Sequence, residues 1–170
     1  MSPLPVLLHE RLSCLPRPLS CHPAMPDHVG EMRALIAAEV EESLANAPAE
    51  VRGMMTGMRL DEWRSGLRRR RPGATPLILL GREGVAGGMV LDWTGSGPIL
   101  LLDGVIHPAL RNGGLGGQVI AGLCALAGQA GRPLRITLLY NNPARRLLAR
   151  HGFRPVQESG VDVVLERAAG

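Results

Sequence analysis

Four glycines within seven residues mark the part of this sequence that points most directly to chemistry. They lie in RNGGLGG, residues 111–117, between the apolar run PILLLDGVI at 98–106 and a helix-periodic apolar run at 114–130. A helix start carries unpaired N–H groups and partial positive charge, and glycine lets a ligand approach the backbone closely. Strand, glycine-rich turn and helix start together predict an anion site suited to a pyrophosphate.

Two common nucleotide motifs fit the residues around these glycines poorly. A P-loop requires Lys followed by Ser or Thr after its last glycine, and the chain contains no Lys. A dinucleotide fingerprint follows the first strand of a parallel unit, whereas the strand-like runs before residue 111 are spaced like an antiparallel meander. Most bare glycine-rich turns bind no phosphate, so the surrounding elements have to decide.

The elements that position this turn follow from hydrophobic periodicity and from turn and capping residues. In chain order we predict an edge strand within 12–24, helices at 26–44 and 59–71, strands at 76–82, 85–93 and 98–106, a helix at 114–130, a strand at 133–140, a helix at 142–152 and a hairpin of 153–157 with 161–167. Asp27 is the expected N-cap of the first helix, Asp61 lies near the start of the second, and Asn142 caps the last. This order predicts an α+β (mixed α/β) domain over residues 12–170, after a flexible arm over 1–11.

Two linked blocks of this sequence resemble the GNAT superfamily of N-acetyltransferases. The first, IHPALRNGGLGGQVI, carries that family's R/Q-x-x-G-x-G/A signature as Arg111 to Gly116, after its hydrophobic-x-Pro as Ile106 to Pro108. The second, NNPARRLLARHGF at 141–153, resembles the family's Asn-Pro-Ala…Gly-Phe segment. The close resemblance covers about residues 98–156, and the N-terminal half matches only in element order. It implies a central, mostly antiparallel sheet with a splayed parallel strand pair, flanked by helices.

The resemblance also implies an acetyl-CoA site at the glycine-rich turn. Backbone amides of 113–117 would hold the pyrophosphate, and Arg111 would shape the turn or meet a phosphate oxygen. The strand ending at Val105 and Ile106 would part from the strand at 133–140, and the pantetheine arm would lie in that gap. The implied cofactor-binding residues are Val105, Ile106, Arg111, Asn112, Gly113, Gly114, Leu115, Gly116, Gly117 and Asn142.

Acetyl transfer from a thioester to an amine needs a base for the amine, a donor for the carbonyl oxygen and a proton for the thiolate. Asp103 is the candidate base, because a carboxylate at the end of an apolar strand is costly without a task or a partner. The alternative is that Asp103 caps a turn or pairs with an arginine, and Asp92 is a second candidate base. Family members often carry the acid as a tyrosine where this chain has Leu148, so Tyr140, the chain's one tyrosine, or water would replace it.

The charge and the cysteine content limit which partners and which cellular compartment we expect for this chain. The net charge is +4, the 19 basic residues are all Arg, and aromatic residues make up 2%. The RRRR run at 68–71 could bind nucleic-acid phosphates, but the aromatic side chains that would stack on bases are scarce. The arginines also complement the dipole at a helix C-terminus. If they lie beside an acetyltransferase site, they would favour an acidic acceptor. Cys14, Cys21 and Cys124 are an odd number, so we expect no disulfide framework and a reducing, cytoplasmic location. No metal site is expected, because Cys14, Cys21 and His22 lack a second ligand pair.

Two functional hypotheses involve coenzyme A, and they stand beside the hypothesis of a nucleic-acid-binding protein that the RRRR run motivates. The first is an acetyltransferase that moves the acetyl group of acetyl-CoA to a primary amine of a small molecule, peptide or protein. The alternative is a catalytically degenerate acyl-CoA-binding or sensing domain, which the missing tyrosine motivates. The expected partners are acetyl-CoA and an amine acceptor, without a membrane, in a monomer or a homodimer.

Overall fold

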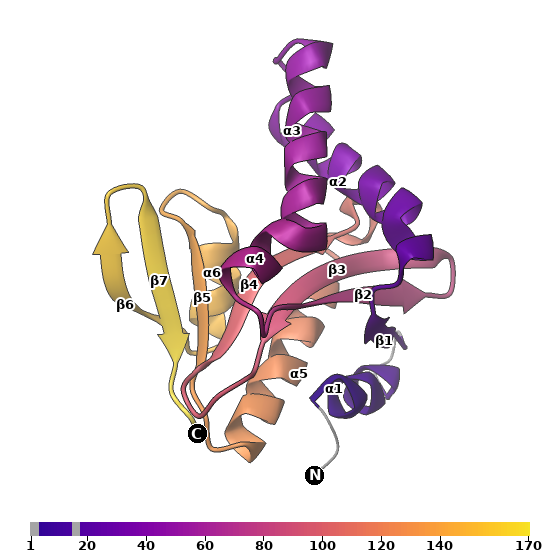
Figure 1. The fold of residues 1–170 in the computed structure, drawn as a ribbon. Helices are drawn as coiled ribbons and strands as arrows, with labels where there is room; N and C mark the ends of the chain where they lie inside the picture. Colours follow the sequence, from indigo (N-terminus) through magenta and orange to yellow (C-terminus); the bar gives the residue numbers. More distant parts are fainter. Residues whose placement is uncertain (1–3, 15–17) are drawn as a thin grey trace.

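A seven-stranded sheet runs through the protein in the order β1-β2-β3-β4-β5-β7-β6 (Figure 1). The computed structural model describes residues 4–14 and 18–170. The strands are β1 (Ser20–Pro23), β2 (Thr75–Gly81), β3 (Gly84–Asp92), β4 (Ile99–Ile106), β5 (Leu134–Leu139), β6 (Arg154–Ser159) and β7 (Asp162–Arg167). The β4–β5 pair is parallel, and the other neighbouring pairs are antiparallel. The structure thus confirms the predicted mixed class, the meander of 76–106, the early edge strand and the final hairpin.

Helices cover both faces of the sheet. They are α1 (Leu4–Ser13), α2 (Val29–Ser43), α3 (Ala49–Asp61), α4 (Leu67–Arg70), α5 (Leu115–Gln129) and α6 (Ala144–Arg150), with 3-10 turns at Pro26–His28 and Pro108–Leu110 and a π-helical segment at Glu62–Gly66. Over the described ranges, none of these helices combines the length and apolarity that crossing a membrane requires.

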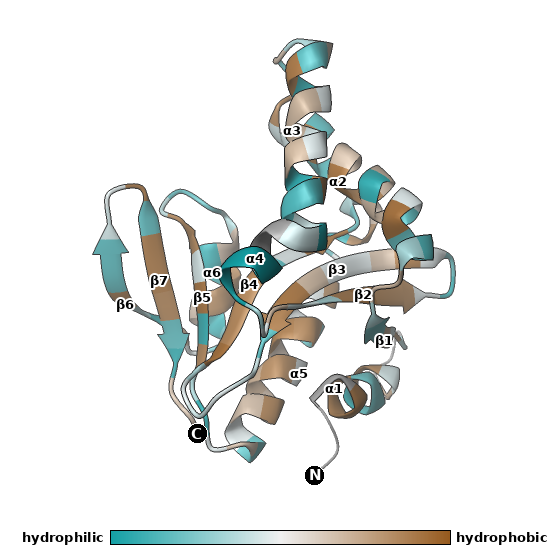
Figure 2. Ribbon diagram, viewed as in Figure 1, coloured by the Kyte–Doolittle hydropathy of each residue, from teal (hydrophilic) through white to brown (hydrophobic). Residues whose placement is uncertain are grey.

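Two hydrophobic clusters lie on opposite sides of the sheet. One joins the strands to α1, α5 and α6, and the other joins them to α2, α3 and the π-helical segment. Along β2, Leu77 and Leu79 pack in the first cluster and Ile78 packs in the second. A strand buried on both faces has a continuous apolar run, which is why 76–82 lacks polar alternation. Figure 2 shows the apolar central strands beside the polar ribbons of α4 and β6.

The predicted flexible arm is wrong from residue 4 onward, because Leu4–Ser13 forms α1. Leu8 and Leu12, one turn apart, are both 0% exposed and belong to the cluster that includes α5. Gly122 of α5 makes room for this contact, since a Cβ there would lie 3.4 Å from Leu12 Cδ2. Pro5 lies in the first turn of α1, where proline is compatible with a helix. Residues 1–3 lie outside the described residues, and a single domain over 12–170 stays a prediction.

The second predicted helix begins earlier than expected. The sequence predicts it over 59–71, whereas α3 starts at Ala49 and continues through the π-helical segment into α4. Gly53 and Gly57 weaken the helical signal of this stretch, because glycine has a low helix propensity. Burial of Leu60 overrides that preference, and Asp61 ends α3 instead of starting a helix.

The first predicted helix, 26–44, corresponds to a 3-10 turn followed by α2. Asp27 lies inside the 3-10 turn, and His28 occupies the N-cap position of α2 without a side-chain capping bond. The prediction that Asp27 caps this helix is therefore wrong. Proline at position 26 starts the 3-10 turn and moves the first full helical turn to Val29.

Candidate functional site

The parallel strands β4 and β5 separate soon after they meet. Their pairing covers Ile99↔Leu134, Leu100↔Arg135 and Leu101↔Ile136, and it ends there although β4 runs on to Ile106. Over the same length β4 stays paired with β3, and β5 stays paired with β7. The facing edges of 102–106 and 137–139 therefore present backbone N–H and C=O groups to a gap between the strands. This confirms the predicted splay.

A β-bulge in β4 accounts for the separation. In the β3–β4 pair, Val90 faces Asp103 but Leu91 faces Leu101, so Leu102 is an extra residue in β4. A bulge bends its strand and increases the local twist, and this one follows directly after the last residue that pairs with β5. The bulge also places Asp103 opposite Val90, on the face of the sheet that α2 and α3 cover.

The glycine-rich turn lies where β4 leads into α5. Asn112 has φ +60° and Gly114 has φ +81°, so two left-handed residues reverse the chain before α5 begins at Leu115. The amide of Gln118 donates to Gly114 O at 3.0 Å and is the first to bond within the helix. The preceding amides of 115–117 are the ones that a helix start leaves unpaired, at the positive end of the helix dipole.

Gly116 and Gly117 allow α6 to lie against the start of α5. A Cβ on Gly116 would be 3.5 Å from Leu147 Cδ2, and one on Gly117 would be 3.5 Å from His151 Nε2. A methyl group fits at those distances, but a longer side chain meets α6 or covers the free amides. These two positions therefore tolerate a methyl group but not a longer side chain, while Gly114 serves the backbone conformation.

Arg111 ties the turn to two other elements. Its Nε donates to Ile106 O at 3.1 Å, and its Nη1 pairs with Glu42 near the end of α2. Of the two roles expected for Arg111, shaping the turn agrees with these contacts, whereas contact with a phosphate oxygen stays a prediction.

Asp103 is 30% exposed and already has two neighbours. Its Oδ1 accepts from the Gly104 amide at 2.8 Å and lies 3.7 Å from Arg59 Nη2. The arginine pairing considered from the sequence is thus present, and a role as base stays a prediction. Asp92 instead uses Oδ1 to accept from Thr94 N at 3.0 Å and Thr94 Oγ1 at 2.6 Å, so it stabilises the β3–β4 turn.

The segment after β5 caps and flanks α6. Asn142 Oδ1 accepts from Ala144 N at 2.9 Å, which confirms the predicted cap. The Tyr140 ring is 54% exposed and has the Arg145 guanidinium 4.2 Å from its centre. Arg145 Nη1 also donates to Tyr140 O at 2.7 Å. For the described residues, no hydrogen bond involves the Tyr140 hydroxyl, and its role as acid stays a prediction.

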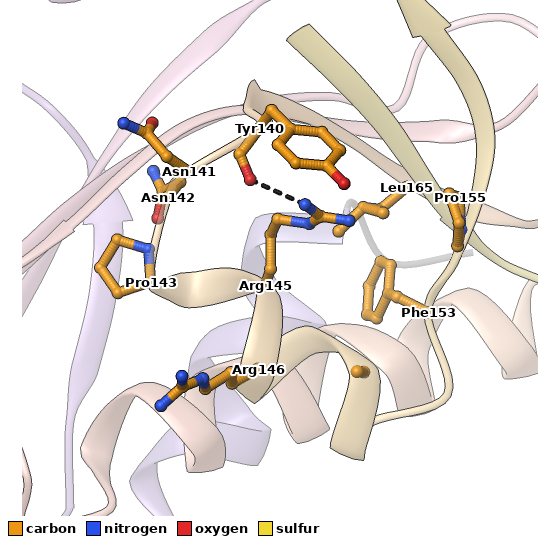
Figure 3. Close-up of a pocket in the computed structure, with 10 residues that line it drawn as sticks. Tyr140, Asn141, Asn142, Pro143, Arg145, Arg146, Phe153, Pro155 and Leu165 are labelled. Carbon is orange, nitrogen blue, oxygen red and sulfur yellow. Dashed lines mark hydrogen bonds between the residues drawn. The ribbon is translucent and has the colours of Figure 1, made fainter. Parts of the chain in front are cut away.

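A hollow of about 620 Å³ adjoins Tyr140 on the side of α6 that faces β6 and β7. Phe153, Pro155 and Leu165 form its apolar part, and Figure 3 shows Arg145 pointing between Tyr140 and Phe153. The β4–β5 gap opens on the other side of β5, so the hollow is not the gap. Leu148, in the position where the resemblance implies a tyrosine, is 1% exposed and packs in the core.

Sequence reasoning missed the contribution of α2 and α3 to this site. Glu39 pairs with Arg59, Glu41 Oε2 lies 2.8 Å from Arg52 Nε, and Glu42 pairs with Arg111. The only signal in the sequence is the density of carboxylates in EVEES, residues 39–43, which resembles an ordinary solvated helix face.

Two buried thiols lie away from the gap. Burial raises the pKa of Cys21 to about 12, and burial also raises the pKa of Cys124. Both thiols therefore stay protonated at neutral pH and are poor nucleophiles.

No protein-family model matches this sequence, and no curated protein matches it either. Solved structures do match the fold. The PaiA N-acetyltransferase from Thermoplasma acidophilum, in complex with coenzyme A, is 11% identical with a TM-score of 0.69, covering 88% of this chain and 98% of that one. An acetyltransferase from Thermus thermophilus is 17% identical with a TM-score of 0.65, covering 88% and 96%. A GCN5-related N-acetyltransferase from Rhodopseudomonas palustris is 20% identical with a TM-score of 0.62, covering 88% and 94%. The chain therefore has the fold of the GNAT acetyltransferases, as its two sequence blocks predicted.

Proposed function

We propose that this chain is an N-acetyltransferase that moves an acetyl group from acetyl-CoA to a primary amine. One observation carries the proposal: the splayed edge of β4 leads, through the 3-10 turn Pro108–Leu110 and the glycine-rich turn, into a helix start whose free amides follow a left-handed glycine. The parted strands offer backbone groups to an extended thiol arm, and the amides offer donors to a diphosphate. The coenzyme A complex of a protein with the same fold supports this assignment.

The residues at the site fit acetyl-CoA. In the proposal, the amides of Leu115, Gly116 and Gly117 hold the pyrophosphate, since no Cβ at the two glycines restricts access. The edge of β4 beyond its pairing with β5, at Val105 and Ile106, binds the amides of the pantetheine arm as a neighbouring strand would, with the Ile106 carbonyl shared with Arg111 Nε.

The remaining residues of the predicted set flank this path. Asn112 and Gly113, both exposed, form the outer rim of the turn. Arg111 holds the turn against β4. A phosphate bound beside Arg111 would compete with Glu42 for the ion pair with its guanidinium. Asn142 lies at the opposite strand, where its capping bond fixes the start of α6.

The chemistry that this chain has to supply is proton handling and charge stabilisation. Acetyl-CoA supplies an activated acetyl thioester. The amine nitrogen forms the new C–N bond while the C–S bond breaks, one amine proton passes to Asp103 directly or through water, and the sulfur takes up a proton from water or Tyr140. A free N–H of β4 donates to the carbonyl oxygen as that oxygen gains negative charge.

Release of free thiol from acetyl-CoA in the presence of a panel of primary amines tests the activity. The variant Gly114→Val tests the site, and Gly131→Val is its matched control at the other end of α5. Both glycines have positive φ, +81° and +63°, and a Cβ added at either would meet no atom within 4 Å. We expect each to lower the free energy of unfolding by about 1–3 kcal/mol.

Only Gly114→Val should weaken acetyl-CoA binding. The expected loss is about 10- to 100-fold, because hydrogen bonds from the amides to a charged phosphate would be lost. Calorimetric titration with acetyl-CoA measures this effect. Equal loss of affinity in both variants would show that the turn acts through stability alone, and the proposed phosphate site would be wrong.

A second candidate is an acyl-CoA-binding domain without turnover. The burial of Leu148, at 1% exposure, favours it, because that position supplies no proton donor. Binding of acetyl-CoA without thiol release across the amine panel would support this candidate over the enzyme.

We also propose a cytoplasmic location. The three cysteines are unpaired, and Cys14 is exposed, which suits a reducing compartment. Fractionation of cells that express the full chain measures this directly.

A further inference from the structure

Three charged side chains meet beside the unpaired part of β4. Arg59 of α3 pairs with Glu39 of α2 through Nη1, and its Nη2 lies 3.7 Å from Asp103 Oδ1. We call these three residues the acceptor cluster. Their side chains are 29%, 26% and 30% exposed, so each is largely shielded from water. Charge interactions under such cover are stronger than those between fully solvated groups.

The acceptor cluster is unbalanced in charge. It holds two carboxylates and one guanidinium, and the guanidinium contacts the two carboxylates unequally. The 3.7 Å separation from Asp103 exceeds hydrogen-bonding distance, whereas Glu39 is in direct contact. Among the described residues, Asp103 is otherwise engaged only by the Gly104 amide, and both contacts use Oδ1 rather than Oδ2. The two neighbouring ion pairs, Arg52–Glu41 and Arg111–Glu42, are each neutral and leave the excess negative charge in place.

Building on the function proposed above, we infer that Arg59 is the residue that sets the charge of the acceptor. Its guanidinium contacts Glu39 directly and lies 3.7 Å from Asp103 Oδ1, so it compensates the charge of Glu39 more fully than that of Asp103. When an amine binds, Arg59 stays on Glu39, and the ammonium becomes the cation of Asp103. The acceptor is therefore a net cationic amine, and an amine whose chain also carries a carboxylate is disfavoured by like-charge repulsion.

This inference replaces the acidic acceptor that the arginine run suggested from the sequence. In α4, Arg70 pairs with Glu62, and Arg69 Nη1 donates to Ser65 Oγ at 2.9 Å. Within the described parts of the chain, neither arginine contacts the acceptor cluster. The charged group next to Asp103 is the Arg59 guanidinium, which Glu39 also contacts, and the summed charge of the three groups, two carboxylates and one guanidinium, decides the preference.

The test measures equilibrium binding of three probes that share a five-carbon chain. They are cadaverine, n-pentylamine and δ-aminovalerate, with net charges of plus two, plus one and zero. Each is titrated by calorimetry into the full chain saturated with coenzyme A, so that no turnover is needed. We expect the wild-type protein to bind both cationic probes at least about tenfold more tightly than δ-aminovalerate, as one partly shielded charge contact allows.

Variants then change the charge of the acceptor cluster in opposite directions. Glu39→Gln removes the excess negative charge and should reduce the cation preference several-fold. Arg59→Gln removes the positive charge, so the excess negative charge grows and the cation preference should increase several-fold. Arg59→Lys keeps the charge and should leave the preference unchanged. Glu41→Gln is the matched control, since it breaks an α2–α3 ion pair that does not contact Asp103.

The inference is overturned if the wild type has no cation preference, or if Glu39→Gln and Glu41→Gln change it equally. It is also overturned if Arg59→Gln, verified as folded by thermal unfolding, leaves the preference unchanged. Cation preference without thiol release from acetyl-CoA would remove the enzyme proposal alone, because this readout does not depend on catalysis.

Discussion

The glycine-rich turn at 111–117 and the acceptor cluster border the same strand, yet they are built from different parts of the polypeptide. The turn presents backbone amides, and its requirements are a left-handed φ at Gly114 and close packing at Gly116 and Gly117. The acceptor cluster presents side chains from α2, α3 and β4, held by ion pairs. Under the proposed function, acetyl-CoA binding should depend mainly on the backbone and on side-chain bulk at the turn, with a smaller contribution from Arg111, whereas acceptor binding should depend on individual charges.

The largest expected effect comes from bulk at the turn. Gly117→Leu should weaken acetyl-CoA binding about 100-fold or more, because atoms beyond Cβ meet His151 and Leu147 or cover the free amides. Gly57→Leu on α3 is the control, since nothing lies within 4 Å of a Cβ there. Calorimetric titration measures both affinities. Similar affinities in the two variants would show that the glycine-rich turn is no more sensitive to bulk than α3 is.

Loss of a side chain at the turn should have a smaller effect. Arg111→Gln removes the 3.1 Å bond to Ile106 O and the pair with Glu42, and should weaken acetyl-CoA binding about tenfold. Arg52→Gln removes an ion pair whose glutamate is 65% exposed, and should change this affinity by less than about twofold. An Arg52→Gln effect as large as that of Arg111→Gln would mean that α3 also organises the cofactor site.

The smallest expected effect is on stability, and it contrasts the glycines of α3 with those of the glycine-rich turn. Gly53→Ala and Gly57→Ala should each raise the free energy of unfolding by about 0.5–1 kcal/mol, because alanine is the better helix former. Neither glycine has a positive φ, and a Cβ added at either would have no neighbour within 4 Å. Urea unfolding measures the change. A decrease would indicate that α3 requires these glycines for a contact or a motion.

The sequence predicted best where the chain itself decides local conformation. Every predicted strand from 76 onward is present, and so are α5 and α6, because apolar runs in this half end at glycine or proline. The prediction failed where tertiary burial overrides local preference. α1 depends on the burial of Leu8 and Leu12, and α3 forms despite Gly53 and Gly57.

The glycine-rich turn was likewise easier to locate from the sequence than the acceptor cluster. The backbone turn is encoded within seven consecutive residues, so its pattern is visible in one short stretch. Arg59 and Glu39 are 20 residues apart, and Arg111 and Glu42 are 69 apart. No local pattern predicts that such residues will meet, so Glu39, Glu42 and Arg59 were not among the predicted site residues.

By itself the sequence determined the conformation of the glycine-rich turn, the strand before it and the helix after it, since glycine, proline and hydrophobic period act over a few residues. Only the tertiary structure revealed the bulge in β4 that accompanies the predicted separation from β5, and the approach of Arg59, paired with Glu39, to Asp103. The physical reason is range: backbone preferences are local, whereas strand separation and charge pairing depend on which distant segments pack against each other.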